Sequence, residues 1–413
     1  MRRNWVWLIL FLATGCQTAA LQPNGSTTRL VFIAQPSNTV ANQPLAPAIA
    51  VAVLDDSGNT VADFVGTVTI SLSANTAGGT LSGTQTQIPF HGIATFSDLR
   101  IDLSGNGYTL VASAAGLDAV TSAAFDISCI TSCWFVQAPM PTRRTFAGSG
   151  VLGGELYVVG GLGSQGRSAT VEAYDPATNT WATRASLPTP RAELAVGVLN
   201  GTLYAVGGSV LGADATGIVE AYDPTTNRWT TKRSMPGPRS ALSVVVANGL
   251  LYAIGGTGQS GQDTTVVQAY DPGSNSWTTK ASMQVARSAF GAAVVNNVIY
   301  VFGGDGPVSP LGSMEAYDPG SDHWTSKAPM LTPRSVLGGA SANGFVYAVG
   351  GRTNDVSSTV ERYDPATNSW TATARMPTAR VLLSVGVVDG ILYAIGGSSA
   401  GKPFLTANES FQE

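Results

Sequence analysis

Short apolar runs alternate with short polar turns along the last two thirds of the chain. The stretch 239–280 contains four such runs, which are 241–247, 250–256, 266–270 and 276–280. Asn248-Gly249 separates the first two and favours a two-residue hairpin, because both residue types tolerate positive φ. Asp271-Pro272 opens a second turn between the last two runs. None of the runs has helical periodicity, so the pattern predicts one antiparallel sheet of four short strands.

This unit recurs six times with a period of 46 to 48 residues. Glycine pairs mark the repeats and end at Gly161, Gly208, Gly256, Gly304, Gly351 and Gly397. An arginine lies seventeen residues before each second glycine, at Arg144, Arg191, Arg239, Arg287, Arg334 and Arg380. A tryptophan lies ten residues before every one of these arginines. A period of this length predicts stacked equivalent units, because one small sheet cannot bury both of its faces alone.

The glycine pair, the phrase Glu-x-Tyr-Asp-Pro, the tryptophan and the arginine after a proline-rich stretch together resemble the kelch repeat. The resemblance covers residues 134–413. Kelch repeats build β-propellers, so the resemblance implies a six-bladed propeller over this range. In kelch propellers the loops on one face commonly bind ligands, and the resemblance implies the same use here.

The two ends of the repeat region predict how the ring closes. The sixth repeat ends at Phe411 without a fourth strand or a tryptophan, whereas Trp134 precedes the first arginine by the usual ten residues. We therefore expect strand 134–138 to complete the last blade beside strand 407–411.

Residues 28–128 also show β-type alternation. Strands are expected at 30–35, 48–54, 67–73, 92–99, 108–114 and 123–128, with turns at 55–59 and 104–107. This spacing fits an immunoglobulin-like β-sandwich. Gly79-Thr80-Leu81-Ser82-Gly83 and its surroundings resemble bacterial surface Ig-like repeats, which implies a spacer. The expected fold class is all-β, a six-bladed kelch propeller preceded by an Ig-like sandwich.

The first residues indicate export. In residues 1–15, Arg2 and Arg3 precede an apolar stretch that is too short to span a bilayer, as in a signal peptide. Residues 12–16 resemble a bacterial lipoprotein cleavage site, with Ala13 where a larger aliphatic residue is typical. The resemblance implies lipidation of Cys16, a tether over 16–27 and an outer-membrane location. An ordinary secretory signal is the alternative.

The remaining cysteines, Cys129 and Cys133, lie in a linker over 129–133. In an exported protein such a pair predicts a disulfide. Two histidines and three cysteines in the whole chain supply too few ligands for a metal site, so we expect neither metal nor cofactor. The net charge of −4, without a basic patch, argues against nucleic acid as a partner.

The six arginines are expected at the start of each blade's first strand, around one mouth of the central channel. Partners are available on the third strands, at Glu172, Glu220, Gln268, Glu315, Glu361 and Glu409. One interpretation is a ring of structural Arg–Glu ion pairs. The other is an anion-binding mouth, in which Arg239 and Arg287 are unpaired because Gln268 interrupts the series of glutamates.

Further candidate residues lie on the same face. Arg167 and Arg352 on the variable loops are candidate ligand contacts. Glu193 is the only acid beside a repeat arginine, Arg191, and is the best candidate for an acid or base. No Ser–His–Asp set can be argued, because no base is available on this face.

These observations favour a surface-anchored, non-enzymatic recognition protein whose propeller face binds a protein, peptide or glycan. The alternatives are a carbohydrate-active enzyme of the kelch sugar mutarotase type, which acts on sialic acid, and a structural spacer of the cell envelope. Fold alone cannot choose among these functions, because propellers host many.

Overall fold

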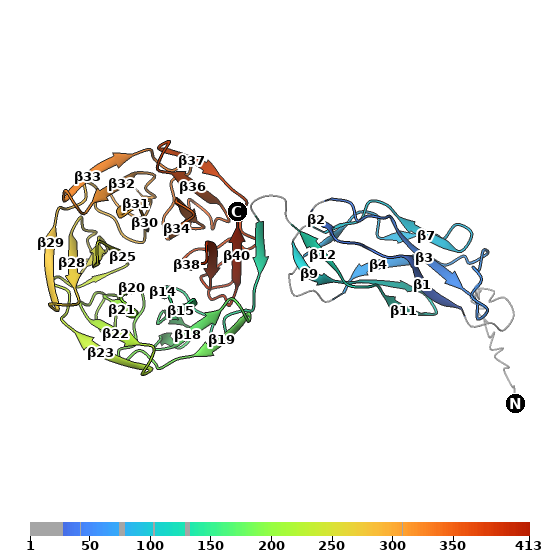
Figure 1. Ribbon diagram of the computed structural model, residues 1–413, viewed down its shortest axis with the longest axis horizontal. Helices are drawn as coiled ribbons and strands as arrows, with labels where there is room; N and C mark the ends of the chain where they lie inside the picture. Colours follow the sequence, from blue (N-terminus) through green and yellow to red (C-terminus); the bar gives the residue numbers. More distant parts are fainter. Residues whose placement is uncertain (1–27, 42, 74–78, 102–103, 129–132, 308) are drawn as a thin grey trace, which may run out of the picture.

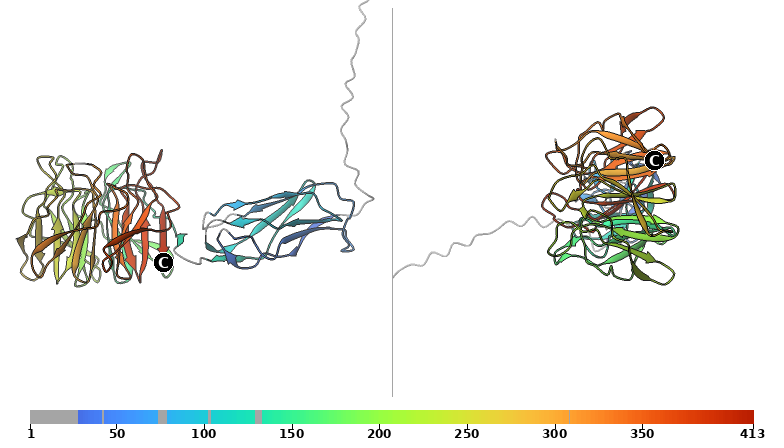
Figure 2. Two further views of the ribbon diagram at one scale, coloured as in Figure 1. Left: turned by 90° about the horizontal axis from the view of Figure 1, so that it is seen from above. Right: turned by 90° about the vertical axis from the view of Figure 1, so that its left-hand side faces the viewer.

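All regular elements are β-strands in the computed structural model, which describes residues 28–41, 43–73, 79–101, 104–128, 133–307 and 309–413. Six four-stranded antiparallel sheets surround a central channel (Figure 1). Seen from the side, their strands run roughly parallel to the axis of a short cylinder (Figure 2). The predicted six-bladed propeller is therefore confirmed.

The strands of each blade follow one another from the channel outward (Figure 1). Blades 1 to 3 consist of β14 (Gly148–Leu152), β15 (Glu155–Val159), β18 (Val171–Asp175) and β19 (Thr180–Thr183); β20 (Ala195–Leu199), β21 (Thr202–Val206), β22 (Val219–Asp223) and β23 (Arg228–Lys232); and β25 (Ser243–Ala247), β26 (Leu250–Ile254), β28 (Val267–Asp271) and β29 (Ser276–Lys280). Blades 4 and 5 consist of β30 (Gly291–Val295), β31 (Val298–Phe302), β32 (Met314–Asp318) and β33 (His323–Lys327); and β34 (Gly338–Ala342), β35 (Phe345–Val349), β36 (Val360–Asp364) and β37 (Ser369–Ala372). Blade 6 consists of β38 (Ser384–Val388), β39 (Ile391–Ile395), β40 (Asn408–Gln412) and β13 (Cys133–Val136).

Blade 6 joins the two ends of the repeat region, as the sequence predicts. β13 pairs antiparallel with β40, and Trp134 lies opposite Phe411. The centroids of their aromatic rings lie 5.3 Å apart. The Trp134 Nε1–H also donates to the carbonyl of Ala374 in blade 5, at 2.9 Å, so the closing strand is held by both of its neighbours.

The glycine pairs are required where one blade meets the next. The N–H of Gly304 in blade 4 donates to the carbonyl of Arg334 in blade 5 at 2.9 Å. A Cβ on Gly303 would lie 2.6 Å from that carbonyl oxygen, and both glycines have positive φ. All six blades repeat this link, and Gly397 to Arg144 closes the circle at 3.1 Å. Neighbouring blades are therefore joined through positions that exclude any side chain.

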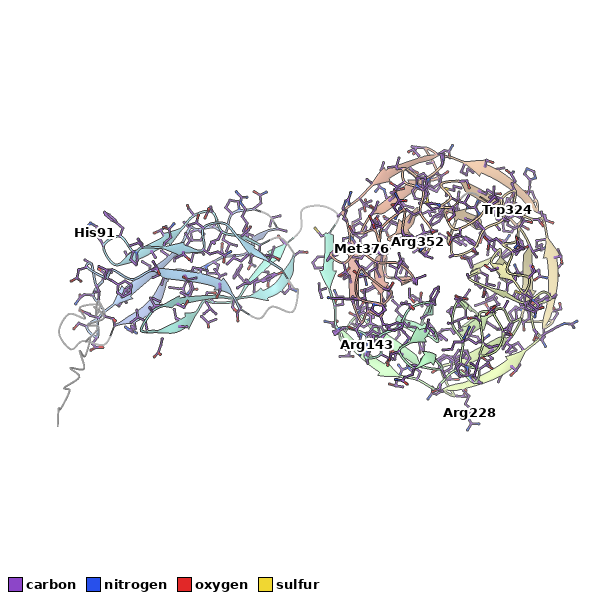
Figure 3. All side chains as sticks on the ribbon, turned by 180° about the vertical axis from the view of Figure 1, so that it is seen from behind. His91, Arg143, Arg228, Trp324, Arg352 and Met376 are labelled. Carbon is purple, nitrogen blue, oxygen red and sulfur yellow. The ribbon has the colours of Figure 1, made fainter. Side chains whose placement is uncertain are left out.

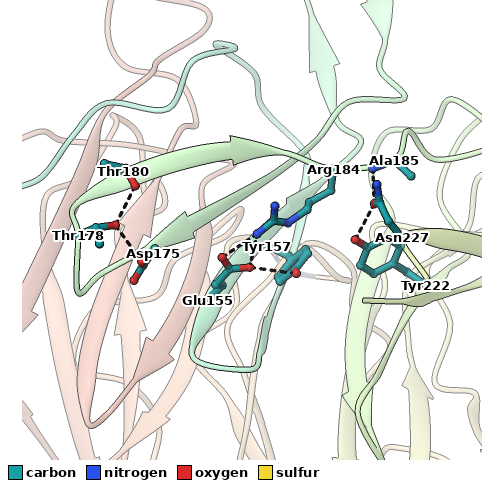
Figure 4. A network of polar contacts seen from close by, with 9 residues as sticks. All are labelled: Glu155, Tyr157, Asp175, Thr178, Thr180, Arg184, Ala185, Tyr222 and Asn227. Carbon is teal, nitrogen blue, oxygen red and sulfur yellow. Dashed lines mark hydrogen bonds and ion pairs between the residues drawn. The ribbon is translucent and has the colours of Figure 1, made fainter. Parts of the chain in front are cut away.

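Aromatic and amide side chains link the outer strands. Tyr222 packs on Trp229 of the adjacent strand, with centroids 5.2 Å apart. Its hydroxyl donates to Asn227 Oδ1, which also accepts the N–H of Ala185 from the previous blade (Figure 4). The same figure shows Arg184, which donates to Glu155 at 2.7 Å. The repeat aromatics thus serve as packing and as hydrogen-bonded links between blades.

The N-terminal part forms its own core. Its strands are β1 (Arg29–Ala34), β2 (Thr39–Val40), β3 (Ile49–Leu54), β4 (Val68–Leu72), β5 (Leu81–Ser82), β6 (Thr86–Gln87), β7 (Ile93–Phe96), β8 (Arg100–Ile101), β9 (Gly105–Tyr108), β10 (Leu110–Ala114), β11 (Leu117–Thr121) and β12 (Phe125–Ser128). The sheets β1-β3-β7 and β11-β10-β4-β6 bury residues of one shared hydrophobic cluster. The expected turn at 104–107 is wrong, because β9 occupies it and pairs with β12. The Ig-like assignment of this part stays a prediction.

The predictions about export and one end of the linker lie outside the described residues. This applies to residues 1–27, with Cys16, and to Cys129. Cys133 is disulfide-bonded, and Cys129 stays its predicted partner. No helix in the described part of the chain is long and apolar enough to span a membrane.

Candidate binding site at the channel mouth

Six residues, one from each blade, form a closed ring of backbone hydrogen bonds. Each stands two positions after a repeat arginine, and we call them the axial ring: Phe146, Glu193, Ala241, Ala289, Val336 and Leu382. The N–H of Glu193 donates to the carbonyl of Phe146 at 2.9 Å, and five equivalent bonds of 2.9 to 3.3 Å complete the circle. The axial ring joins all six blades, including blade 6, which contains both ends of the repeat region.

All six residues of the axial ring have left-handed backbone conformations, with φ between +48° and +57°. This conformation costs an L-residue roughly 1–2 kcal/mol, and Val336 is β-branched, which makes it a clear outlier. Such positions persist where the surrounding structure fixes them, and they gather at functional sites. The ring is therefore a reason to look for a site at this mouth.

A cavity of about 130 Å³ opens at the axial ring. Its lining consists of the axial ring and the residue that follows each member, namely Ala147, Leu194, Leu242, Phe290, Leu337 and Leu383. Glu193 is the one polar residue in this lining. Since the backbone N–H groups of the axial ring are used within the ring, these six residues cannot form an oxyanion hole.

The Glu193 carboxylate has no hydrogen-bond or ion-pair partner within the described part of the chain. Arg191, two positions earlier, is paired with Glu220 instead. Arg167 of the preceding blade donates its Nε–H to Ser209 Oγ at 3.2 Å and makes no ion pair with Glu193 among the described residues. A single half-buried carboxylate therefore stands in an apolar cup.

The six repeat arginines do not reach this cavity. They lie four residues before the first strand of each blade, so their expected place at the start of that strand is wrong. Their exposed fractions are 3 % or less. Five form ion pairs within their own blades: Arg144–Glu172, Arg191–Glu220, Arg287–Glu315, Arg334–Glu361 and Arg380–Glu409. The expectation that Arg287 is unpaired is wrong, because Glu315 Oε1 lies 2.8 Å from its Nη2.

Carbonyl groups complete the environment of each guanidinium. Arg191, for example, donates to the carbonyls of Gly207 at 3.0 Å and Ile218 at 2.8 Å. The Nε of each repeat arginine meets no acceptor among the described residues. The guanidiniums thus tie the second and third strands of a blade together from within. Buried in this way, they offer no surface to an anion.

Blade 3 differs because its third strand carries Gln268. Arg239 donates to Gln268 Oε1 at 2.8 Å and to the carbonyls of Gly255 and Val266. Burial lowers the pKa of Arg239 to about 10, and no carboxylate opposes this shift. In the other five blades burial also lowers the pKa of the arginine, but the neighbouring glutamate raises it and so opposes the shift.

The segment before Arg239 also differs in blade 3. In the other blades the glutamate accepts a second hydrogen bond, either from a threonine hydroxyl, as from Thr189 in blade 2, or from a backbone N–H, as from Leu331 in blade 5. The corresponding residues of blade 3 are Pro236, which has no N–H, and Gly237, which has an N–H but no hydroxyl. A carboxylate in blade 3 would therefore lack the threonine hydroxyl of blade 2 and the N–H that Leu331 offers in blade 5.

Two candidate residues, Arg167 and Arg352, lie on the loops that follow the glycine pairs. Arg352, labelled in Figure 3, is exposed. Its backbone pairs with that of Ser335. Arg167 is half-buried at the end of the small ladder of β16 (Leu162–Gly163) and β17 (Gly166–Arg167). Neither residue lines the cavity. Of the predicted site residues, only Glu193 does.

The sequence reasoning singled out Glu193 but missed the rest of the axial ring. Phe146, Val336 and their equivalents are apolar residues of different size, and no residue type marks the position. The one feature of the sequence that could have identified these residues is their constant position, two residues after each arginine. The described residues also contain no group of three or more His, Cys, Asp or Glu that could hold a metal ion.

The fold and the mouth define a six-bladed β-propeller with an apolar cup on its axis. The family model of the KLHDC2/KLHL20/DRC7 Kelch-repeats domain matches residues 122–256 and 230–397. The chain therefore belongs to the kelch-repeat family. The solved structure of YjhT is similar, with a TM-score of 0.60, 16 % sequence identity and coverage of 67 % of this chain and 99 % of that chain. At this identity the likeness shows the fold alone. None of the curated proteins compared with the chain matches it.

Proposed function

We propose that this chain is an exported, lipid-anchored recognition protein that binds a protein or peptide through the loop face of its propeller. The cavity at the axial ring carries the proposal. At about 130 Å³ it is smaller than the roughly 300–1,000 Å³ of most small-molecule sites. It is close to the roughly 150 Å³ cavity that accepts benzene, and so suits one inserted side chain.

The chemistry of the mouth supports binding over catalysis. Acid–base chemistry on a sugar needs groups that reach the substrate, and the repeat arginines are buried and engaged. Glu193 stands alone in the lining, without a second titratable group beside it. Loops that vary in length surround the mouth, and the tip of one of them exposes Leu211 almost completely, at 92 %. Exposed loop residues around a rigid scaffold are a common arrangement for recognition.

The anchoring part of the proposal depends on the sequence. The signal-like residues 1–15 and Cys16 would hold the protein on the membrane, and the N-terminal β-domain would space the propeller from it. Cys16→Ser should release the protein from the membrane fraction while leaving its export intact. Unchanged membrane association of this variant would contradict the lipid anchor.

The binding proposal is tested by panning the purified full chain against a displayed random peptide library and a glycan array. We expect enriched peptides whose binding is lost with Leu211→Asp on the loop face. Ala177→Asp is the matched control, because Ala177 is exposed in the turn between β18 and β19 on the opposite face. Binding that is equal in both variants, or enrichment of glycans alone, would overturn the proposal.

The same preparation decides between binding and sugar chemistry. Proton NMR of sialic acid anomers after dilution measures their interconversion. A rate above that in buffer, lost in Glu193→Gln, would replace the recognition proposal by the mutarotase.

A further inference from the structure

We infer that the cup formed by Phe146, Glu193 and the apolar remainder of the cavity lining binds a basic side chain, of the lysine type, from the partner. The inference rests on the proposed function and specifies which group of the partner enters the mouth. An anion-binding mouth would have the opposite sign, but all six repeat arginines are buried and five of them are paired with glutamates.

The cup carries one unpaired negative charge. Glu193 is the one ionisable residue among the twelve that line the cavity, and its carboxylate has no partner in the described residues. A carboxylate partly removed from water and unpaired is costly, so a cation placed beside it gains more than it would at an open surface. The repeat arginines cannot compensate it, because Arg191 is bound to Glu220 at 2.8 Å.

The rest of the cup suits the aliphatic part of a lysine side chain. Phe146 is the axial-ring neighbour of Glu193, joined to it by the 2.9 Å backbone bond. An ammonium group near both residues would combine an ion pair with a cation–π interaction. The other ten lining residues are alanine, leucine, valine or phenylalanine, which suit the methylene stem of a lysine. A carboxylate ligand would be repelled by Glu193 and would find no free N–H on the axial ring.

The backbone explains why the cup should keep its shape when the carboxylate is altered. The six hydrogen bonds of the axial ring involve no side chain, and Glu193 contributes to them only through its N–H and carbonyl. Glu193→Gln preserves size and backbone and removes only the charge. Phe146→Leu likewise preserves an apolar residue while removing the aromatic face.

The test uses n-butylammonium, which reproduces the end of a lysine side chain, and 1-butanol as its neutral counterpart. Saturation-transfer NMR with the full chain measures the affinity of each. We expect saturable binding of butylammonium that weakens at least tenfold in Glu193→Gln. A loss of about two- to fivefold is expected in Phe146→Leu, corresponding to about 0.5–1 kcal/mol for a cation–π contact. Butanol binding should be the same in the wild type and in Glu193→Gln.

Asp214→Asn is the matched control, because Asp214 is an exposed carboxylate on a loop of the same face and its change alters the net charge equally. This variant should bind butylammonium like the wild type. No saturable binding, or equal effects of Asp214→Asn and Glu193→Gln, overturns the inference. Enriched peptides that lack basic residues would also overturn it while leaving the recognition proposal intact. Butylammonium binding without any enriched peptide would contradict the recognition proposal instead.

Discussion

Replacing Glu220 by glutamine tests whether the buried guanidiniums need a counter-charge. The side chains of Arg191 and Glu220 are 0 % and 2 % exposed, and their charged atoms lie 2.8 Å apart. Blade 3 already contains the product of this change, since Gln268 accepts a hydrogen bond from Arg239 at 2.8 Å. Glu220→Gln therefore removes one charge and keeps both the shape and the hydrogen bond.

The expected loss of stability is the difference between large terms. Two charges about 4 Å apart attract by about 4 kcal/mol at an effective dielectric constant of about 20. Against this, a neutral amide avoids the desolvation of a buried carboxylate, and it retains a hydrogen bond to a charged group of about 1.5–3 kcal/mol. We expect the free energy of unfolding to fall by about 1–3 kcal/mol, which is the part of the attraction that the retained hydrogen bond does not replace. One kcal/mol moves Tm by about 2–4 °C in domains of roughly 150–250 residues, so the propeller should melt several degrees earlier.

Calorimetry of the full chain measures this change, with Gln268→Glu as the reverse substitution. The reverse change should gain less than Glu220→Gln loses, because Pro236 has no N–H and Gly237 has no hydroxyl to offer the new carboxylate. An unchanged melting temperature for Glu220→Gln would show that the buried guanidinium does not need its counter-charge. A gain in Gln268→Glu as large as the loss in Glu220→Gln would show that the segment before Arg239 does not limit the carboxylate.

Three further predictions concern the ring and its aromatic residues. Gly255→Ala should lower the free energy of unfolding by more than the roughly 1–2 kcal/mol that a left-handed alanine costs, because its Cβ would lie 2.7 Å from the carbonyl oxygen of Arg287. Gly249→Ala, whose Cβ would meet no atom within 4 Å, should show the conformational cost alone. Equal urea midpoints for the two variants would contradict this prediction. Deleting residues 405–413 removes β40 and should lower Tm sharply, so an unchanged melt would show that the ring does not need this strand. Burial raises the pKa of Tyr157 and Tyr363 from 10.0 to about 12. The contribution of these tyrosines to the free energy of unfolding is therefore complete below pH 10 and is lost as the pH rises from 10 towards 12. Alkaline titration followed by phenolate absorbance and circular dichroism should show ionisation together with unfolding, and ionisation near pH 10 in the folded protein would contradict this prediction.

Much of the propeller could be predicted because its strands are defined by local chemistry. The hairpin at Asn248-Gly249 and the strand Ser276–Lys280 lie where the residues place them. The expected turn at 104–107 failed for a tertiary reason. Its Gly and Asn residues suit a turn, yet β12 offers that segment a partner strand, and pairing decided the outcome.

The site was less predictable than the fold. The sequence left two interpretations of the arginines open, and the structure confirms the Arg–Glu ion pairs in five blades. The sequence could not choose between them, because the same residues allow a guanidinium to face a channel or to bind the carbonyls of its own blade. Glu193 was recognised as unusual for its charge, while Phe146 and Val336 gave no local sign of the left-handed conformation that they share.

The sequence by itself determined the number of blades, their order and the strand that closes them, because each blade repeats the same residues at nearly the same spacing and the unmatched strands at the two ends complete each other. Only the tertiary structure decided that the arginines bind within their own blades and that one glutamate lines the cavity at the axial ring. The reason is physical: whether a polar group is satisfied, strained or left unpaired depends on what five other blades bring to it.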